Sequence, residues 1–257
     1  WDFSLGSIAD VAGNLAGTNF AAANLAGLNV DSIIPVMSSV TPPANAHYIN
    51  GDVLSFTTVF SKAVNVVGNP SLTVRIGLTD RLATYISGSG TTSLLFRVGV
   101  LPDDADSDWI QLQSLNLNSG SIKDSSLNDA SLTLAAVNMA NVVVDGSAPG
   151  VIAITKPNDG YYRSTQSLAW SLQFDKIVFV TNTPTLRLNV GAVTKTLSYL
   201  AGSGTNTLIF SYTTIPGDVA INGVQLLPAI DLSSGQIKDV YGNMIKTSLS
   251  GFGLSYA

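Results

Sequence analysis

Several stretches of the chain alternate apolar and polar residues one by one, which is the pattern of a β-strand that buries one face. The inward positions of the clearest stretches are Leu54, Phe56, Thr58 and Phe60; Leu72, Val74 and Ile76; Leu94, Phe96 and Val98; and Leu168, Trp170, Leu172 and Phe174. Turn residues such as Asn50-Gly51-Asp52 and Gly68-Asn69-Pro70 separate these stretches. No stretch combines the 3.6-residue period of a helix with helix caps, so the pattern predicts an all-β chain.

The chain also repeats itself. The seven residues from Tyr85 to Thr91 recur with two changes from Tyr199 to Thr205, 114 positions later, and we call this spacing the repeat offset. The same offset pairs Pro35 with Pro149, Tyr48 with Tyr162, Phe60 with Phe174, Phe96 with Phe210 and Leu112 with Leu226. One inserted residue then makes the offset 115, which pairs Ile122–Asp124 with Ile237–Asp239. These ungapped matches indicate a tandem duplication.

The offset also runs backwards from the first full copy. It pairs Ile8, Asp10, Asn14 and Asp31 with Ile122, Asp124, Asn128 and Asp145. The repeat therefore predicts the C-terminal part of a preceding repeat over residues 1–33, repeat 1 over 34–146 and repeat 2 over 147–257. Asn-apolar pairs that recur every five residues from Asn14 to Val30 also suggest a pentapeptide coil. Such a coil would make about one turn, too little to bury a core, which favours the end of a repeat.

Short strands about every 8–12 residues, in units of roughly 100 residues, predict two tandem immunoglobulin-like β-sandwiches. One large β-barrel is the alternative, but a barrel does not predict the duplication. The joint from Val144 to Pro149 matches the stretch from Val30 to Pro35. A short joint that contains proline limits bending and suits stacked repeats.

The order of these motifs resembles the Ig-like repeats of large bacterial surface proteins and adhesins. The matching marks are Val30–Pro35, Tyr48–Asp52, Phe60–Val64, Asn69–Leu72, Tyr85–Thr91 and Gly120–Asn128. The second copy keeps most of them, but Asp159-Gly160 and Thr165 depart from the Gly-Asp pair of the first. The resemblance covers nearly the whole chain, and it implies a stalk or an adhesive arm outside a bacterial cell.

Composition narrows the classes of function. Only 11% of residues are charged and the net charge is −5, which favours an extracellular setting and disfavours nucleic acid as a partner. The chain has no cysteine, so disulfides, thiolate metal sites and cysteine nucleophiles are excluded. It has no run of 18 apolar residues, so we expect no membrane insertion. The first residues lack a basic segment followed by an apolar one, so we expect no signal peptide there.

An acidic loop is the candidate metal site. Asp104, Asp106 and Asp108 alternate as carboxylates do at the start of a calcium loop. Trp109 replaces the glycine and Leu115 the closing glutamate of an EF-hand, so a solvated turn is the alternative reading. The second copy keeps only Asp218 and Asn222. We therefore expect no cofactor other than a candidate calcium ion.

Two aromatic residues provide a candidate binding site, whereas the sequence offers no clear set of catalytic residues. Trp109 and Tyr161 are candidates to stack on a glycan because each lies at the edge of a predicted strand or in a loop. His47 is the only histidine, and the second copy has Tyr161 in its place. We interpret His47 as an exposed loop residue, and the paired carboxylates lie beside no evident cleft. The sequence therefore predicts that the chain is not an enzyme.

The hypothesis is a structural stalk or fibre module of a bacterial cell-surface adhesin. The alternative is a tip module that binds a glycan or a protein on a host or prey surface. Expected partners are other repeats of the same fibre. Residues 1–33 need a partner that covers apolar side chains such as Phe3, Ile8, Phe20 and Leu25. We expect this partner to be the same segment of neighbouring chains, with a trimer as the expected homo-oligomer; the alternative is that the segment extends a sheet of repeat 1.

Overall fold

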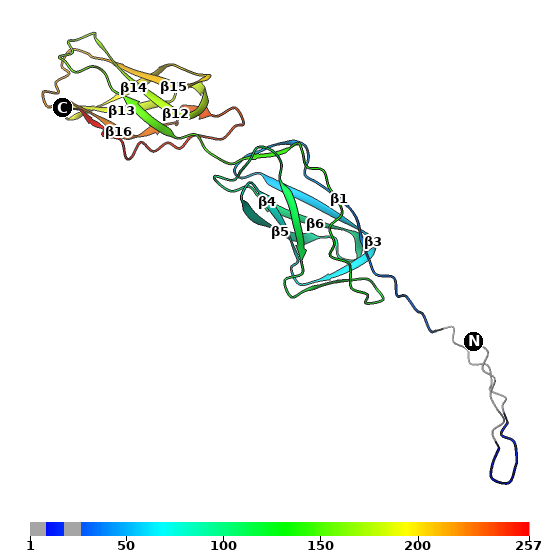
Figure 1. Ribbon diagram of the computed structural model, residues 1–257. Coiled ribbons are helices and arrows are strands. Elements are labelled where there is room, and N and C mark those ends of the chain that lie inside the picture. Colours follow the sequence, from blue (N-terminus) through cyan, green and yellow to red (C-terminus); the bar gives the residue numbers. More distant parts are fainter. Residues whose placement is uncertain (1–8, 18–26, 257) are drawn as a thin grey trace. The chain divides into compact units, whose positions relative to one another are not determined.

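The computed structural model describes residues 9–17 and 27–256 of the 257-residue chain. All regular elements in these residues are β-strands, which confirms the all-β prediction (Figure 1). None of the described residues forms a helix with the length and apolarity needed to cross a membrane. The chain separates into two compact units, Trp1–Ile33 and Ile34–Ala257, and the eighteen strands found in the described residues belong to the second.

A curled antiparallel sheet with strand order β1-β3-β6-β5-β4-β8 encloses the first core. Its strands are β1 (Met37–Thr41), β3 (Val53–Val67), β4 (Ser71–Ile76), β5 (Thr79–Ser87), β6 (Thr91–Gly99) and β8 (Gln111–Asn116), and β9 (Ser121–Lys123) pairs with β3. Strand β3 changes partner along its length: Val53–Val59 and, after an irregularity, Val64 pair with β6, and Asn65–Val67 pair with β9. This change of partner folds the sheet over its own apolar face and produces an immunoglobulin-like sandwich.

A second, smaller sheet completes the first sandwich. Strand β10 (Val142–Asp145) lies between β2 (Ala46–Tyr48), to which it is parallel, and β7 (Ala105–Asp106), to which it is antiparallel. The side chains of Val142 and Val144 are 0% and 1% exposed and belong to the first core. Strand β10 therefore covers the core as well as pairing two other strands.

The second sandwich follows the same plan. Its strands are β11 (Val151–Thr155), β12 (Ser167–Asn182), β13 (Thr185–Val190), β14 (Val193–Ala201), β15 (Thr205–Thr213), β16 (Val224–Asp231), β17 (Gly235–Lys238) and β18 (Ser255–Tyr256). The sheet order is β11-β12-β15-β14-β13-β16-β18, and the end of β12 pairs with β17. The pairing of β12 is interrupted between Gln173 and Val178, as that of β3 is between Val59 and Val64.

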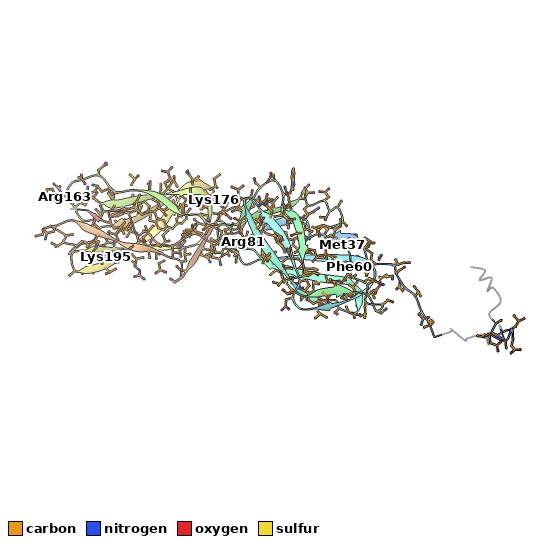
Figure 2. The ribbon with its side chains drawn as sticks, turned by 60° about the horizontal axis from the view of Figure 1, so that its bottom comes forward. Met37, Phe60, Arg81, Arg163, Lys176 and Lys195 are labelled. Carbon is orange, nitrogen blue, oxygen red and sulfur yellow. The ribbon has the colours of Figure 1, made fainter. Side chains whose placement is uncertain are left out.

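Aromatic rings fill equivalent places in the two cores. The repeat predicts that Phe56, Phe60, Tyr85 and Phe96 are buried together with their counterparts Trp170, Phe174, Tyr199 and Phe210. Six of these eight rings are at most 2% exposed, and the exceptions are the two tyrosines. Phe60 in β3 lies opposite Met37 in β1, and the two side chains are labelled in Figure 2. The expectation of full burial is wrong for Tyr85 and Tyr199, which are half-buried.

The two tyrosines stay partly exposed because their hydroxyl groups hold a loop. The backbone N–H of Ser89 donates to the hydroxyl oxygen of Tyr85 over 2.8 Å, and that of Ser203 donates to Tyr199 over 2.8 Å. Within this loop Gly88 has φ of 114°, and a Cβ there would lie 1.9 Å from the carbonyl oxygen of Ser93. The loop therefore requires glycine at this position, which explains the Gly-Ser-Gly motif in both copies.

The unit of residues 1–33 is described only in part. An isolated β-bridge joins Ala9 and Leu15, and no longer strand is formed among residues 9–17 and 27–33. The apolar side chains for which we expect cover, Phe3, Ile8, Phe20 and Leu25, lie outside the described residues. The Asp31 carboxylate accepts a hydrogen bond from the backbone N–H of Ile33 over 3.1 Å.

Candidate functional site

The acidic loop places its three carboxylates in different surroundings. Asp104 is 4% exposed and accepts hydrogen bonds from the Arg81 Nε over 3.0 Å and from the backbone N–H of Leu101 over 2.9 Å. The guanidinium group of Arg81 also makes an ion pair with this carboxylate. Both oxygens of Asp104 therefore already accept N–H donors of the protein.

The other two aspartates, Asp106 and Asp108, share a hydrogen bond with each other. The buried Asp106 carboxylate accepts hydrogen bonds from the backbone N–H groups of Gly77 and Trp109 over 2.7 Å and 3.0 Å. Asp108 is exposed, and a hydrogen bond with Asp106 lowers its pKa below the ordinary value. Across the described part of the chain, no three His, Cys, Asp or Glu side chains are grouped so that they could hold a metal ion. Calcium binding by the three aspartates stays a prediction.

The second sandwich repeats the environment of Asp104. The repeat offset pairs Asp104 with Asp218 and Arg81 with Lys195, and Lys195 Nζ lies 2.7 Å from an Asp218 carboxylate oxygen. Hydrogen bonds from Lys195, from the Tyr212 hydroxyl and from a backbone N–H lower the pKa of Asp218 to about 2. Each sandwich thus contains an aspartate with a largely buried side chain that is paired with a cation.

The two candidate aromatic residues lie in separate pockets. Trp109 is 49% exposed and lines a pocket of about 480 Å³ with Leu134 and Met139. Tyr161 is fully exposed and lines a pocket of about 490 Å³ in the second sandwich with Leu168 and Trp170. The structure therefore does not bring Trp109 and Tyr161 together, and glycan binding by either residue stays a prediction.

His47 takes part in a contact between the two sandwiches. It lies in strand β2 rather than in the loop that we expect, and its ring stacks on Tyr241 with centroids 4.4 Å apart and an interplanar angle of 18°. A second contact joins the same two sandwiches, because Lys246 Nζ lies 3.5 Å from the Asp103 carboxylate. These contacts flank a larger polar cluster.

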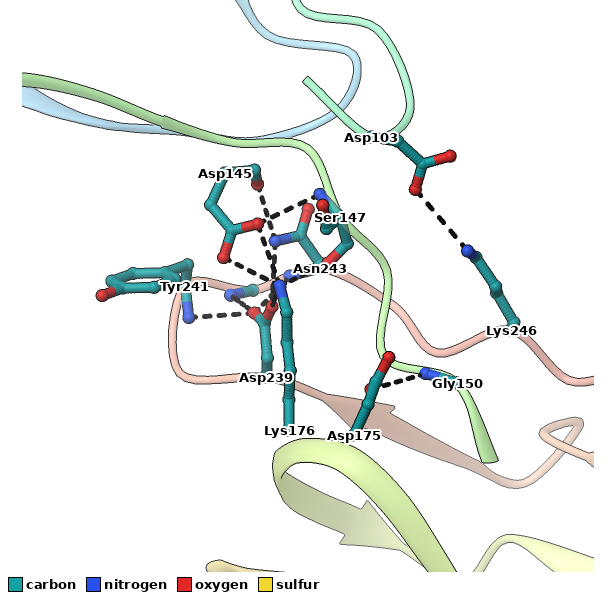
Figure 3. A network of polar contacts seen from close by, with 11 residues as sticks. Asp103, Asp145, Ser147, Gly150, Asp175, Lys176, Asp239, Tyr241, Asn243 and Lys246 are labelled. Atoms are coloured by element: carbon teal, nitrogen blue, oxygen red, sulfur yellow. Dashed lines mark hydrogen bonds and ion pairs between the residues drawn. The ribbon is translucent and has the colours of Figure 1, made fainter. Parts of the chain in front are cut away.

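We call this cluster the joint network: it consists of Asp145, Ser147, Lys176, Asp239 and Asn243 (Figure 3). Lys176 Nζ donates to both carboxylate oxygens of Asp145 over 2.9 Å and to the carbonyl oxygen of Ser147 over 2.7 Å. It also lies 3.4 Å from a carboxylate oxygen of Asp239. Burial alone would lower the pKa of Lys176, but the bonds and charges of Asp145 and Asp239 outweigh burial and raise it. One ammonium group thus neutralises two carboxylates.

The remaining members fix the orientation of these carboxylates. The backbone N–H groups of Tyr241, Gly242 and Asn243 donate to one oxygen of Asp239 over 2.9–3.0 Å. The side-chain amide of Asn243 donates to the other oxygen over 3.0 Å and to the backbone carbonyl of Asp145 over 2.8 Å. Asp145 ends strand β10 of the first sandwich, whereas Lys176 belongs to β12 of the second. The joint network therefore connects framework strands of both sandwiches.

The same residues recur at the repeat offset in the first sandwich. Lys62 Nζ lies 3.1 Å from the buried Asp124 carboxylate, which also accepts bonds from the backbone and side-chain amides of Asn128. The side-chain amide of Asn128 contributes most to lowering the pKa of Asp124 to about 2. The repeat offset already pairs Lys62, Asp124 and Asn128 with Lys176, Asp239 and Asn243 in the sequence. The spacing along the chain does not indicate, however, that the lysine and the aspartate of each copy lie in contact. Lys62 and Lys176 both lie where the long strand changes partner, and the recurrence of a charged residue there is the signal that reveals the site.

No family model matches the chain, and no curated protein sequence matches it. Among solved structures, the chain is similar to the human OSCAR ligand-binding domain, with 8% identity, a TM-score of 0.24, and 83% of this chain and 95% of that chain covered. It is also similar to a marsupial T cell receptor, with 15% identity, a TM-score of 0.27, and coverage of 78% of this chain and 60% of the receptor chain. Likenesses with these TM-scores carry no argument about function, and the resemblance to adhesin repeats stays a prediction.

Proposed function

We propose that this chain is a structural stalk module of a bacterial cell-surface adhesin or fibre and that it has no enzymatic activity. Its partners in this role are further repeats of the same fibre, and its setting is extracellular. The proposal combines the Ig-like fold with the resemblance of the motifs to surface-protein repeats. A stalk has to hold its modules in series, so the part of the structure that bears on this role is the joint.

The joint network is the observation that carries the proposal. Strand β10 is held on one side by the burial of Val142 and Val144 in the first core, and its last residue, Asp145, is bound on the other side by Lys176. Tension along the chain would therefore pass from one core to the next through hydrogen-bonded strands and not through a loose linker. Repeat 1 carries Lys62, Asp124 and Asn128 at the positions that match Lys176, Asp239 and Asn243 of the joint network.

Stretching a single molecule tests the stalk role. With the two ends held in magnetic tweezers, we expect two separate unfolding steps and refolding after the force is released. Each step should release roughly 350 Å of chain, at ~3.3–3.6 Å per residue. A chain that lengthens smoothly at low force, without steps, would contradict a load-bearing role.

The alternative function is a tip module that recognises a surface glycan or protein, and the pocket beside Tyr161 is the observation that favours it. A glycan array separates the two roles. A stalk retains no sugar, whereas a tip retains one sugar class and loses it in the Tyr161→Ala variant. Trp109→Ala is the matched control, because Trp109 lies in a different pocket.

A further inference from the structure

The two sandwiches differ in how one edge of the main sheet is covered. In the second sandwich, residues 247–254 run along the outer edge of β16 and bind it. Three backbone hydrogen bonds of 2.9 Å and one β-bridge make this contact: Ile230 N–H to Thr247 O, Leu249 N–H to Pro228 O, Leu226 N–H to Leu254 O, and Ala229 with Ser248. We call residues 247–254 the second strap, and residues 132–139, which match them at an offset of 115, the first strap.

The first strap makes none of these bonds. Leu112 and Leu115 of β8 take the places of Leu226 and Ile230 and face matching residues of the neighbouring strand, so their N–H groups point to the same outer edge. Yet no hydrogen bond joins β8 to residues 131–141, all of which the structure describes. A pocket of about 480 Å³ is lined by the start of β8 and by the first strap. The edge of β8 is therefore open where that of β16 is closed.

A backbone angle explains why only the second strap is closed. Gly251 in the second strap has φ of 99°, a value that residues with a Cβ rarely adopt. A Cβ there would meet no atom within 4 Å, so the angle and not the space requires glycine. The first strap has Ala136 at this position, and its φ is not positive. To close in the same way, the first strap would have to force an alanine into a strained conformation.

We propose that the first strap is poised to close on the edge of β8 and that Ala136 holds it open. Leu134 and Val137 already pack against the first core, so closure needs only a shift of the strap backbone toward β8. The open strap leaves an unpaired strand edge, at which a sheet can add a further strand, and the closed strap covers that edge. The first strap therefore controls whether the first sandwich can extend its sheet. This inference rests on the two straps and is independent of the stalk role.

Hydrogen exchange of the complete 257-residue chain tests the proposal. In the wild type the amides of Leu112 and Leu115 should exchange fast, whereas the second strap should protect those of Leu226 and Ile230. Ala136→Gly should slow exchange at Leu112 and Leu115 by about tenfold or more, because glycine adopts the required angle without strain. Unchanged exchange in β6, which lies inside the sheet, shows that the variant keeps its fold.

The reverse substitution tests the same angle in the second strap. Gly251→Ala should open this strap and speed exchange of the two β16 amides by about tenfold or more, because alanine disfavours the positive φ. Gly253→Ala is the matched control, because the φ of Gly253 lies outside the positive range and a Cβ there would meet no atom within 4 Å. This control should leave both amides protected.

Ala135→Gly is the control in the first strap, since it adds the same flexibility where the second strap has Ser250 and no glycine. It should leave exchange in β8 as it is in the wild type. Three results would each overturn the proposal: protected β8 amides in the wild type, equal effects of Ala135→Gly and Ala136→Gly, or unchanged exchange of the β16 amides in Gly251→Ala.

Discussion

Phe60 and Phe174 occupy the same place in the two cores, at the residue where the long strand stops pairing with its first partner. Their rings are 2% and 0% exposed. Two positions further along each strand, Lys62 and Lys176 turn outward to the buried carboxylates of Asp124 and Asp239. At this point of each strand, one side chain closes the core and another binds a polar cluster.

Truncation of either ring should remove much of the stability of its own sandwich. We expect Phe60→Ala and Phe174→Ala each to lower the free energy of unfolding by ~3–5 kcal/mol, because a cavity is left where the ring packs. Denaturant titration of each variant measures the effect. Leu78→Ala is the control, since Leu78 is 95% exposed and its loss should cost under ~0.5 kcal/mol. Equal costs at Phe60 and Leu78 would contradict the core assignment.

Acid should weaken the fold through Asp124 and Asp218. Both have a pKa of about 2 in the folded chain against an ordinary value of 3.8. A carboxylate with a lowered pKa stabilises the fold above its unfolded value, and this contribution is lost as the pH falls through the folded value. We therefore expect the melting temperature to drop between about pH 4 and pH 2. Asp124→Asn should flatten part of this drop, and an unchanged pH profile in that variant would contradict the assignment.

At the scale of elements, the hairpin loops between β5 and β6 and between β14 and β15 are held by the same few hydrogen bonds in both copies. The hydroxyl of Tyr85 accepts from the Ser89 N–H, the Ser89 Oγ accepts from the N–H of Val66, and the second copy repeats both bonds with Tyr199, Ser203 and Val180. The loop between β5 and β6 is thereby fastened to β3 as well as to its own hairpin. This arrangement keeps an exposed loop in one conformation.

Removing one hydroxyl should loosen that loop without unfolding the sandwich. Tyr85→Phe should cost about 1 kcal/mol, the usual net contribution of a hydrogen bond. Hydrogen exchange at the Ser89 amide should become faster, and exchange in β4 should not change. Tyr161→Phe is the control because Tyr161 is fully exposed. Unchanged exchange at Ser89 would show that the hydroxyl does not hold the loop.

Calcium at the acidic loop needs a test of its own. If Asp104, Asp106 and Asp108 bind the ion, it has to compete with Arg81 for Asp104. Millimolar calcium should then raise the melting temperature and a chelator should reverse the rise, because a ligand that binds only the folded state stabilises it. Asp108→Ala should abolish the rise, and since Asp108 is exposed the variant keeps its fold. A flat titration of the wild-type chain would contradict the calcium site.

Sequence pattern predicts strands well where one face is buried against the core. The alternation of Leu54, Phe56, Thr58 and Phe60 predicts β3 because each inward side chain is buried there. It does not predict β10, whose parallel partner β2 lies far away in the sequence. The joint network is not predictable from spacing for the same reason, since Asp145, Lys176 and Asp239 meet only after both sandwiches have folded. The acidic run in the sequence suggests Asp104 as a calcium ligand, because nothing in that run shows that Arg81 lies beside its carboxylate.

At the scale of the whole molecule, the joint network decides whether the two sandwiches behave as one body. Asp145 and Asp239 both lie within 3.4 Å of Lys176 Nζ, so removal of the ammonium group would leave two carboxylates facing each other. Two carboxylates that share one ammonium group repel each other once it is removed, and each would seek water. The stacked rings of His47 and Tyr241 add an apolar contact across the same joint. We therefore expect a stiff joint that depends on one lysine.

Residual dipolar couplings test this account most directly, because they report the orientation of each sandwich in solution. For the wild-type chain, one alignment tensor should fit the amides of both sandwiches. In Lys176→Met two different tensors should be needed, whereas Lys123→Met, which removes a surface ion pair within the first sandwich, should behave as the wild type does. A wild-type chain that already needs two tensors of different magnitude would contradict the stiff joint and the stalk role built on it.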